Sequence, residues 1–187
     1  IRSLGFKDAE EALETSAVQS YADNTHGNLS EKEQKQVAQK QSEDIKAGKD
    51  YQNRGLTSAL PDSVRVSIGA ISQTDANMAE AEKKATPALQ QMSDTERESS
   101  LIKVNEVKKM MYDYKQHANA TNVGNAADMK RLSNEYDQIN VKLSDKTFDK
   151  LPQVRSAIQT ELFQSKQSVD IRTPQPQQPS KQDDVKT

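Results

Sequence analysis

The residues from Ala22 to Glu33, ADNTHGNLSEKE, come closest in this sequence to a metal-binding pattern. In a calcium-binding helix–loop–helix, a glycine at the sixth position makes a sharp turn and a glutamate at the twelfth binds the ion through both oxygens. Gly27 and Glu33 stand at these two positions. The first position, which requires a carboxylate, is Ala22, and the fifth is His26, a poor calcium ligand. We therefore interpret the stretch as a helix end followed by the capped start of another helix.

A second pair with metal-binding chemistry is Asp113 and His117, which are four residues apart on one face of a predicted helix. Two ligands do not make a transition-metal site, and a third ligand would have to come from another helix. A contact between the two side chains within the helix, near its C-terminus where positive charge is favourable, is the more ordinary interpretation. The sequence therefore predicts no metal site and no cofactor.

Nucleophilic catalysis has little support in this sequence. There is no cysteine, and the two histidines, His26 and His117, lie in different regions. No G-x-S-x-G motif occurs, and the GKD at Gly48–Asp50 lacks the upstream glycine and the following Ser or Thr of a phosphate-binding loop. The 28 acidic residues offer carboxylate pairs, which we interpret as solvated helix faces. We predict no catalytic residues and no small-molecule substrate.

Composition also limits the possible partners. The chain has 187 residues with 26 basic and 28 acidic side chains, so that its net charge is only −2. Without a basic face it is not predicted to bind nucleic acid, and without a long apolar run it is not predicted to insert into a membrane. The first residue is Ile1, which suggests a segment of a longer polypeptide. The polar, cysteine-free composition of the predicted helices favours a periplasmic, extracytoplasmic or virion location without fixing the compartment.

Helical periodicity dominates the N-terminal part of the chain. We expect a helix over about Lys7–Tyr21 and a second, polar helix from Ser30 to about Ala47. Ser30 and Glu33 would form a capping box, in which each side chain bonds the other residue's amide. Together the two helices would make a polar N-terminal helical hairpin, residues 1–48. A glycine-bounded linker, residues 49–60, would follow it.

Residues 61–72 are ambiguous between strand and helix. Val64, Val66 and Ile68 alternate as in a strand, whereas a helix beginning at Pro61 would place Leu60, Val64, Ile68 and Ile71 on one face. No partner strand is evident elsewhere, so we expect a helix. Helical spacing then continues through Met78, and Pro87 is expected to end or kink this helix, because proline lacks the amide donor.

Three stronger helices are predicted to follow and to complete a bundle over residues 61–172. Their apolar residues recur at steps of three and four, as in an elongated antiparallel helical bundle with coiled-coil packing. The predicted seams are Val104, Val107, Met111 and Tyr114 after a capping box at Ser93 and Glu96; Met129, Leu132, Tyr136, Ile139 and Leu143 in Ala126–Leu143; and Val154, Ile158, Leu162 and Val169 around Gln153–Ser168. A disordered Pro/Gln-rich tail, residues 173–187, would end an otherwise all-α fold.

The first of these three helices carries more apolar surface than one seam needs. Either it lies centrally, with neighbours on two sides, or another protein or a second copy of this chain covers part of it. The candidate partner-binding residues are Leu101, Ile102, Val104, Met110 and Met111. The function that this indicates is a non-catalytic interaction or structural module of a larger assembly protein, of the bacterial envelope, of secretion or conjugation machinery, or of a phage virion. The alternative is a secreted effector or regulatory domain that binds a target-cell protein.

Overall fold

The computed structural model describes residues 29–49 and 60–173 of the chain. Within those ranges there are six α-helices and one short 3-10 turn, and no strand. The elements are α2 (Glu31–Lys46), α3 (Asp62–Ser67), α4 (Gln73–Gln91), α5 (Asp94–Ala120), α6 (Ala126–Leu143), η3 (Lys146–Asp149) and α7 (Pro152–Arg172). The predicted all-α bundle is confirmed. The predicted helix at Lys7–Tyr21 and residues 174–187 of the predicted tail lie outside the described residues.

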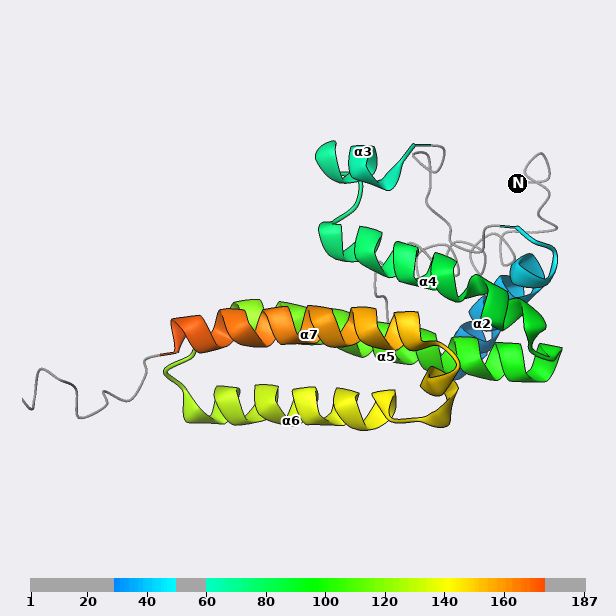
Figure 1. Cartoon of the computed structure of the whole chain (residues 1–187). Helices are drawn as coiled ribbons and strands as arrows, with labels where there is room; N and C mark the ends of the chain where they lie inside the picture. The colour runs from blue at the N-terminus through cyan, green and yellow to red at the C-terminus, as the bar shows by residue number, and fades with distance from the viewer. Residues whose placement is uncertain (1–28, 50–59, 174–187) are drawn as a thin grey trace, which may run out of the picture.

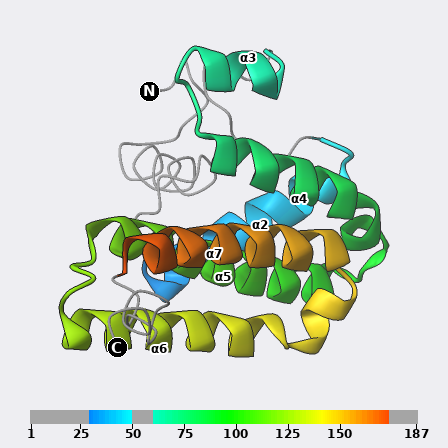
Figure 2. The ribbon, with the colours of Figure 1, turned by 60° about the vertical axis from the view of Figure 1, so that its left-hand side comes forward.

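The helices α5, α6 and α7 lie side by side along the length of the molecule (Figures 1 and 2). Short connections reverse the chain twice, so that α6 is antiparallel to both of its neighbours and α5 and α7 are parallel to each other. In both views α4 and α6 lie on opposite sides of the α5–α7 pair, and α2 packs against α5. The short helix α3 stands at the far end of α4, away from the bundle.

The seams predicted from the spacing form the core of the bundle. Each large apolar side chain of the predicted α7 seam is buried, and Tyr114 of α5 reaches Tyr136 of α6 with 5.7 Å between ring centroids. Phe148 in η3 is fully buried and closes the turn between α6 and α7. The core members on these elements are Val104, Val107, Met111, Tyr114, Leu132, Ile139, Leu143, Phe148, Leu151, Val154, Ile158, Leu162 and Val169.

The helix α2 shares this core although its apolar seam is short. Ala38 and Ile45 are fully buried and belong to the same cluster of core residues. Its capping box forms as predicted, because Ser30 accepts from the amide of Glu33 and the Glu33 carboxylate accepts from the amide of Ser30. The division of the chain at residues 49–60 stays a prediction, since most of that segment is outside the described ranges.

Three arginines satisfy carbonyl groups at the C-terminal ends of other helices. The last carbonyls of a helix have no partner within the helix, so a neighbouring side chain that donates to them fixes the helix end. Arg97 of α5 donates to Leu89 O of α4 at 2.8 Å, and Arg155 of α7 donates to Leu143 O of α6 at 3.0 Å. Arg172 donates to a carbonyl at the end of α5. Each turn of the bundle is thereby fixed by a charge from a neighbouring element.

Two expectations for residues 61–91 need correction. The ambiguous stretch is helical, as predicted, but α3 ends after Ser67, and Gly69, with a φ of 75°, breaks the helix before α4 begins. The helix α4 does not end at Pro87 but continues to Gln91. Proline removes a single amide donor, and burial of Leu89 together with the bonds from Arg97 holds the last turn in place.

The start of α5 differs in one detail from its prediction. Ser93 accepts from the amide of Glu96 at 3.2 Å, as an N-cap should. The reciprocal half of the predicted capping box is not formed, because the Glu96 carboxylate instead pairs with Lys150 at 2.5 Å. A complete capping box that the sequence reasoning missed opens α4, where Ser72 and Asp75 bond each other's amides.

Candidate interaction surface and interior polar network

The five residues predicted to bind a partner divide into two groups. Leu101, Val104 and Met111 are buried in the core of this chain, each no more than 2% exposed. Ile102 and Met110 are partly buried and pack against the edge of that core. The reason is the central position of α5, which contacts α2 on one side and α6 and α7 on the other. Of these five residues, Ile102 and Met110 are the two that remain partly accessible to another protein.

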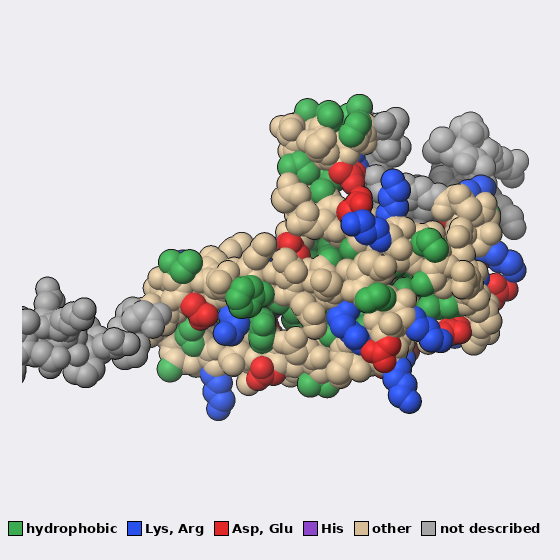
Figure 3. Space-filling view, viewed as in Figure 1, with side chains coloured by type: hydrophobic (Ala, Val, Ile, Leu, Met, Phe, Trp, Pro, Cys, Tyr) green, Lys and Arg blue, Asp and Glu red, His purple; other side chains and the backbone are tan. Residues whose placement is uncertain are grey.

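Within the described part of the chain, an exposed apolar cluster lies on α3 and beside it. Leu60, Val64 and Ile68 are spaced four residues apart and are 39%, 40% and 60% exposed. Arg65 on the same helix is only 3% exposed and pairs with Asp62 at 3.1 Å. Figure 3 shows hydrophobic side chains gathered over α3, above the body of the molecule. The helix thus turns its apolar stripe outward, an orientation that helical spacing alone does not predict.

Three further apolar side chains are exposed on the bundle. Val141 of α6 and Phe163 and Ile171 of α7 are 71%, 53% and 84% exposed. Single exposed apolar side chains are common on soluble proteins and require no partner to explain them. They do show that the outer faces of α6 and α7 offer further apolar contacts.

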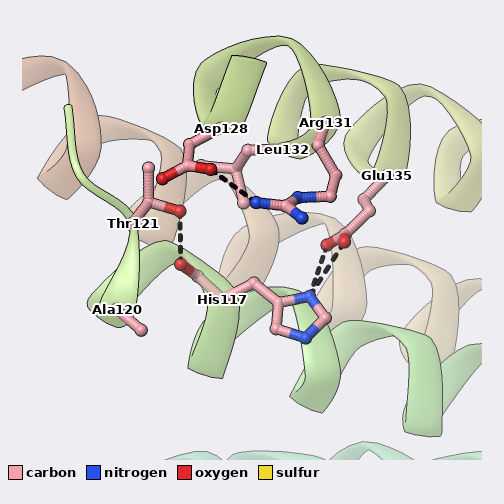
Figure 4. Close-up of a pocket in the computed structure, with 7 residues that line it drawn as sticks. All are labelled: His117, Ala120, Thr121, Asp128, Arg131, Leu132 and Glu135. Carbon is pink, nitrogen blue, oxygen red and sulfur yellow. Dashed lines mark hydrogen bonds and ion pairs between the residues drawn. The ribbon is translucent and has the colours of Figure 1, made fainter. Parts of the chain in front are cut away.

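A polar hollow of about 250 Å³ lies where the end of α5 meets the start of α6. Figure 4 shows the His117 ring turned toward Glu135 on α6, with Arg131 and Asp128 paired beside them. His117 Nδ1 is 2.8 Å and 2.9 Å from the two carboxylate oxygens of Glu135. On the other side, Thr121 donates to the carbonyl of His117 at 2.5 Å.

This geometry corrects the predicted contact between His117 and Asp113. The histidine bonds Glu135 on the neighbouring helix, and Asp113 instead accepts from Lys109 at 2.7 Å. Among the described residues no group of three or more His, Cys, Asp or Glu side chains could hold a metal ion. The hollow presents charges that are already paired, and its evident effect is to join α5 to α6.

Between α4, α5 and α7 lies a polar network that the sequence analysis did not predict. Glu82 of α4 and Lys108 of α5 form an ion pair at 2.9 Å with side chains 2% and 9% exposed. Tyr112 of α5 donates to Asp75 of α4 at 2.5 Å. Burial, together with the nearby carboxylates of Asp75 and Glu82, raises the pKa of Tyr112 above its ordinary value. The phenol therefore stays protonated and keeps donating to Asp75.

Glu161 of α7 is the second centre of this network. Its carboxylate accepts from Thr74 at 2.6 Å and from Asn77 at 3.1 Å, both on α4, and lies 3.2 Å from Lys115 of α5. Burial opposes its ionisation, but the two hydrogen bonds and the charge of Lys115 outweigh burial and lower the pKa of Glu161. A buried carboxylate thus receives donors from α4 and α5 at once.

The spacing of polar residues in the sequence of α5 contains a signal for this network. Lys108, Tyr112 and Lys115 follow one another at steps of four and three, so that they share a second face of the helix, next to the apolar seam. A polar residue on a buried helix face needs a buried partner. The sequence alone does not identify that partner among 28 acidic residues.

Comparisons with known proteins give a consistent result. The family described as "Phage T4-tail tape measure protein" matches residues 1–187, the whole chain. The tape measure protein of Enterobacteria phage T4 is 22% identical over 157 residues, which cover 82% of this chain and 27% of that protein. The chain therefore spans about a quarter of the length of this relative. No solved structure matches. None of the described helices is long and apolar enough to cross a bilayer.

Proposed function

The chain belongs to the phage T4-tail tape measure protein family, and from this premise we propose that it is a non-catalytic structural segment of a phage tail protein. The match over the whole chain is the observation that supports this function most strongly. Of the settings that the sequence indicated, a phage virion is the one that the comparisons support. They lend no support to the bacterial envelope or to secretion or conjugation machinery.

The described residues suit a role in protein contacts rather than chemistry. Glu82 and Lys108 are paired in the interior, and the hollow at His117 contains a hydrogen bond between two helices. An interaction module needs accessible apolar side chains at its surface. The stripe on α3 and the partly buried Ile102 and Met110 on α5 provide such side chains. We propose that other proteins of the tail contact these residues.

The alternative function, a secreted effector or regulatory domain that binds a target-cell protein, predicts a different location. A structural segment stays with the particle, whereas an effector accumulates free of it. The chain flanking these residues in the parent protein would also differ, because an export signal would favour an effector.

Mass spectrometry of purified particles tests the proposal. Virions of the phage that encodes this chain would be purified by density gradient and digested with trypsin. We expect peptides from residues 94–172 in assembled tails at a constant ratio to a major tail protein. Peptides found in the infected-cell lysate or medium but absent from tails and tail-assembly intermediates would contradict a structural role in the tail.

A further inference from the structure

The first part of α4, residues 73–86, makes an interface with little large apolar surface. Its buried residues are Ala76, Met78, Ala79, Ala81, Glu82 and Ala85. Met78 is the one large apolar side chain among them. An alanine methyl buries far less apolar area than a leucine or isoleucine side chain, and each buried CH₂ group contributes about 0.8 kcal/mol. Apolar burial therefore holds this part of α4 weakly.

Polar contacts make up most of the rest of that interface. Three carboxylates, those of Asp75, Glu82 and Glu161, bond across it to Tyr112, to Lys108, and to Thr74 and Asn77. Buried ion pairs add little net stability, because separating the groups returns them to water and recovers their hydration. An interface of this composition tolerates the entry of water, unlike one made of leucine and isoleucine.

The end of α4 is anchored differently. Arg97 is 3% exposed and donates to the carbonyls of Leu89 at 2.8 Å and Met92 at 2.6 Å. Gln90 donates to the carbonyl of Ile45 on α2 at 3.2 Å, and Leu89 is 2% exposed. The last turn of α4 is therefore tied to both α5 and α2.

Pro87 stands between the weakly held part and the anchored part. It lies inside α4, where its missing amide leaves the carbonyl four residues earlier without its helical bond, and this is where helices bend most readily. At the opposite end, among the described elements, α3 contacts mainly α4, and its apolar stripe faces outward.

From this arrangement we propose that α3 and the first part of α4, residues 62–86, form an arm that opens about Pro87 while α2, α5, α6 and α7 stay folded. The arm is defined by three features: polar groups that accept water, one large buried apolar side chain, and a hinge next to a fixed corner. Opening exposes Lys108, Lys115 and Glu161 on α5 and α7, all of which water solvates. The open surface is a helix-sized groove that carries charges of both signs.

Thiol labelling measures this opening in the full 187-residue chain, because the chain contains no cysteine. The Ala79→Cys variant places a thiol on the arm itself, at a position 7% exposed. The Val107→Cys variant places a thiol of similar size under α6, at a position 1% exposed. With excess reagent, each labelling rate reports how often its cover opens. We expect the thiol at position 79 to react at least about tenfold faster than the one at position 107.

Variants in the Ala79→Cys chain show whether the network and the hinge control the opening. Glu161→Gln removes the negative charge that accepts from Thr74 and Asn77 and pairs with Lys115. We expect labelling to accelerate by about tenfold or more. Pro87→Ala restores a helical amide at an exposed position, and we expect labelling to slow by about tenfold or more. Glu106→Gln is the matched control, because Glu106 pairs with Lys142 on the surface of α5 and α6, and we expect no change.

Two results would overturn the proposal. One is equal labelling rates at positions 79 and 107, with the same dependence on denaturant, because the arm would then open only when the whole chain unfolds. The other is a Pro87→Ala rate equal to that of the parent. If Glu161→Gln does not fold, as judged by circular dichroism, Asn77→Ala replaces it. That change removes one donor from an exposed residue and is expected to accelerate labelling in the same direction.

Discussion

The side chains buried on the two sides of α5 are of different types. Toward α6 and the turn at η3 the buried side chains are aromatic or aliphatic, among them Tyr114, Ile139 and Phe148. Toward α4 the buried groups include an ion pair, a tyrosine bonded to a carboxylate and a row of alanines. On the proposed opening of the arm, one helix takes part both in an apolar core and in a contact that separates. The type of side chain buried at each interface determines whether water can enter that interface.

The largest effect is expected from a truncation on the apolar side. Phe148→Ala removes a fully buried ring from the junction of α6 and α7, and we expect the free energy of unfolding to fall by about 3–5 kcal/mol. Because this core is shared by α5, α6 and α7, the loss should appear in every spectroscopic probe. Urea unfolding followed by circular dichroism measures it. A loss below 1 kcal/mol, well under the expected range, would mean that the apolar side is not the stable one.

A smaller effect is expected from breaking the ion pair on the polar side. Lys108→Met removes the ammonium group that lies 2.9 Å from the Glu82 carboxylate. Such a change costs about 3–5 kcal/mol when the site must stay closed. Opening of the arm lets Glu82 reach water and limits the loss, so we expect a fall of about 1–3 kcal/mol in the same urea experiment.

The matched double variant separates charge from packing at this pair. Glu82→Leu combined with Lys108→Met replaces both charges by apolar groups of similar size, and such replacements are often neutral or stabilising by about 1–4 kcal/mol. We expect it to recover the stability lost in the single variant and to slow opening of the arm. If the double variant is less stable than Lys108→Met alone, the network is a net source of stability and the comparison between the two sides fails.

Acidification should weaken the polar side before the apolar side. The pKa of Glu161 is lowered from its ordinary value of 4.5, so the folded state binds that proton less tightly than the unfolded chain does. The stability gained from the ionised carboxylate is present above pH 4.5 and is lost as the pH falls through the lowered pKa. Labelling of the Ala79→Cys variant at decreasing pH, with a reagent that reacts with thiols under acid conditions, measures this loss. In the Glu161→Gln background we expect a weaker dependence on pH.

The smallest effect on stability is expected at the surface of α5. Ile102→Glu and Met110→Glu change side chains at the edge of the core, and we expect each to alter the free energy of unfolding by no more than about 1 kcal/mol. Both should abolish association with a tail partner while helicity stays unchanged. If binding and fold survive both substitutions, the partner uses another surface, and the stripe on α3 is the next to test through Val64→Glu.

Sequence spacing predicted the bundle well because apolar residues at steps of three and four specify helix faces directly. The bounds of α6 and the seam of α7 follow from that rule alone. Pro87 was expected to end or kink α4, and the first of these is wrong, because burial of Leu89 and bonds from Arg97 hold the helix up to Gln91. Tertiary contacts of this kind leave no local pattern.

The candidate surface was harder to predict than the fold. Leu101, Val104 and Met111 gave α5 surplus apolar surface in sequence, and α2, α6 and α7 cover it in the structure. The pairing of Lys108 with Glu82 could not be predicted, because the sequence offers many carboxylates and gives no distances between helices. A central helix and a surface helix share the same spacing, so only the number of neighbours distinguishes them.

Hydrogen exchange of the unmodified chain in rising, sub-denaturing concentrations of urea is the most direct test of the difference between the two sides of α5. We expect the amides of residues 73–86 to exchange through an opening that has a lower free energy and a weaker dependence on urea than the amides of α6 and α7. The last turn of α4 should group with α5. A single opening, with one free energy and one urea dependence for α4, α6 and α7 alike, would contradict the account.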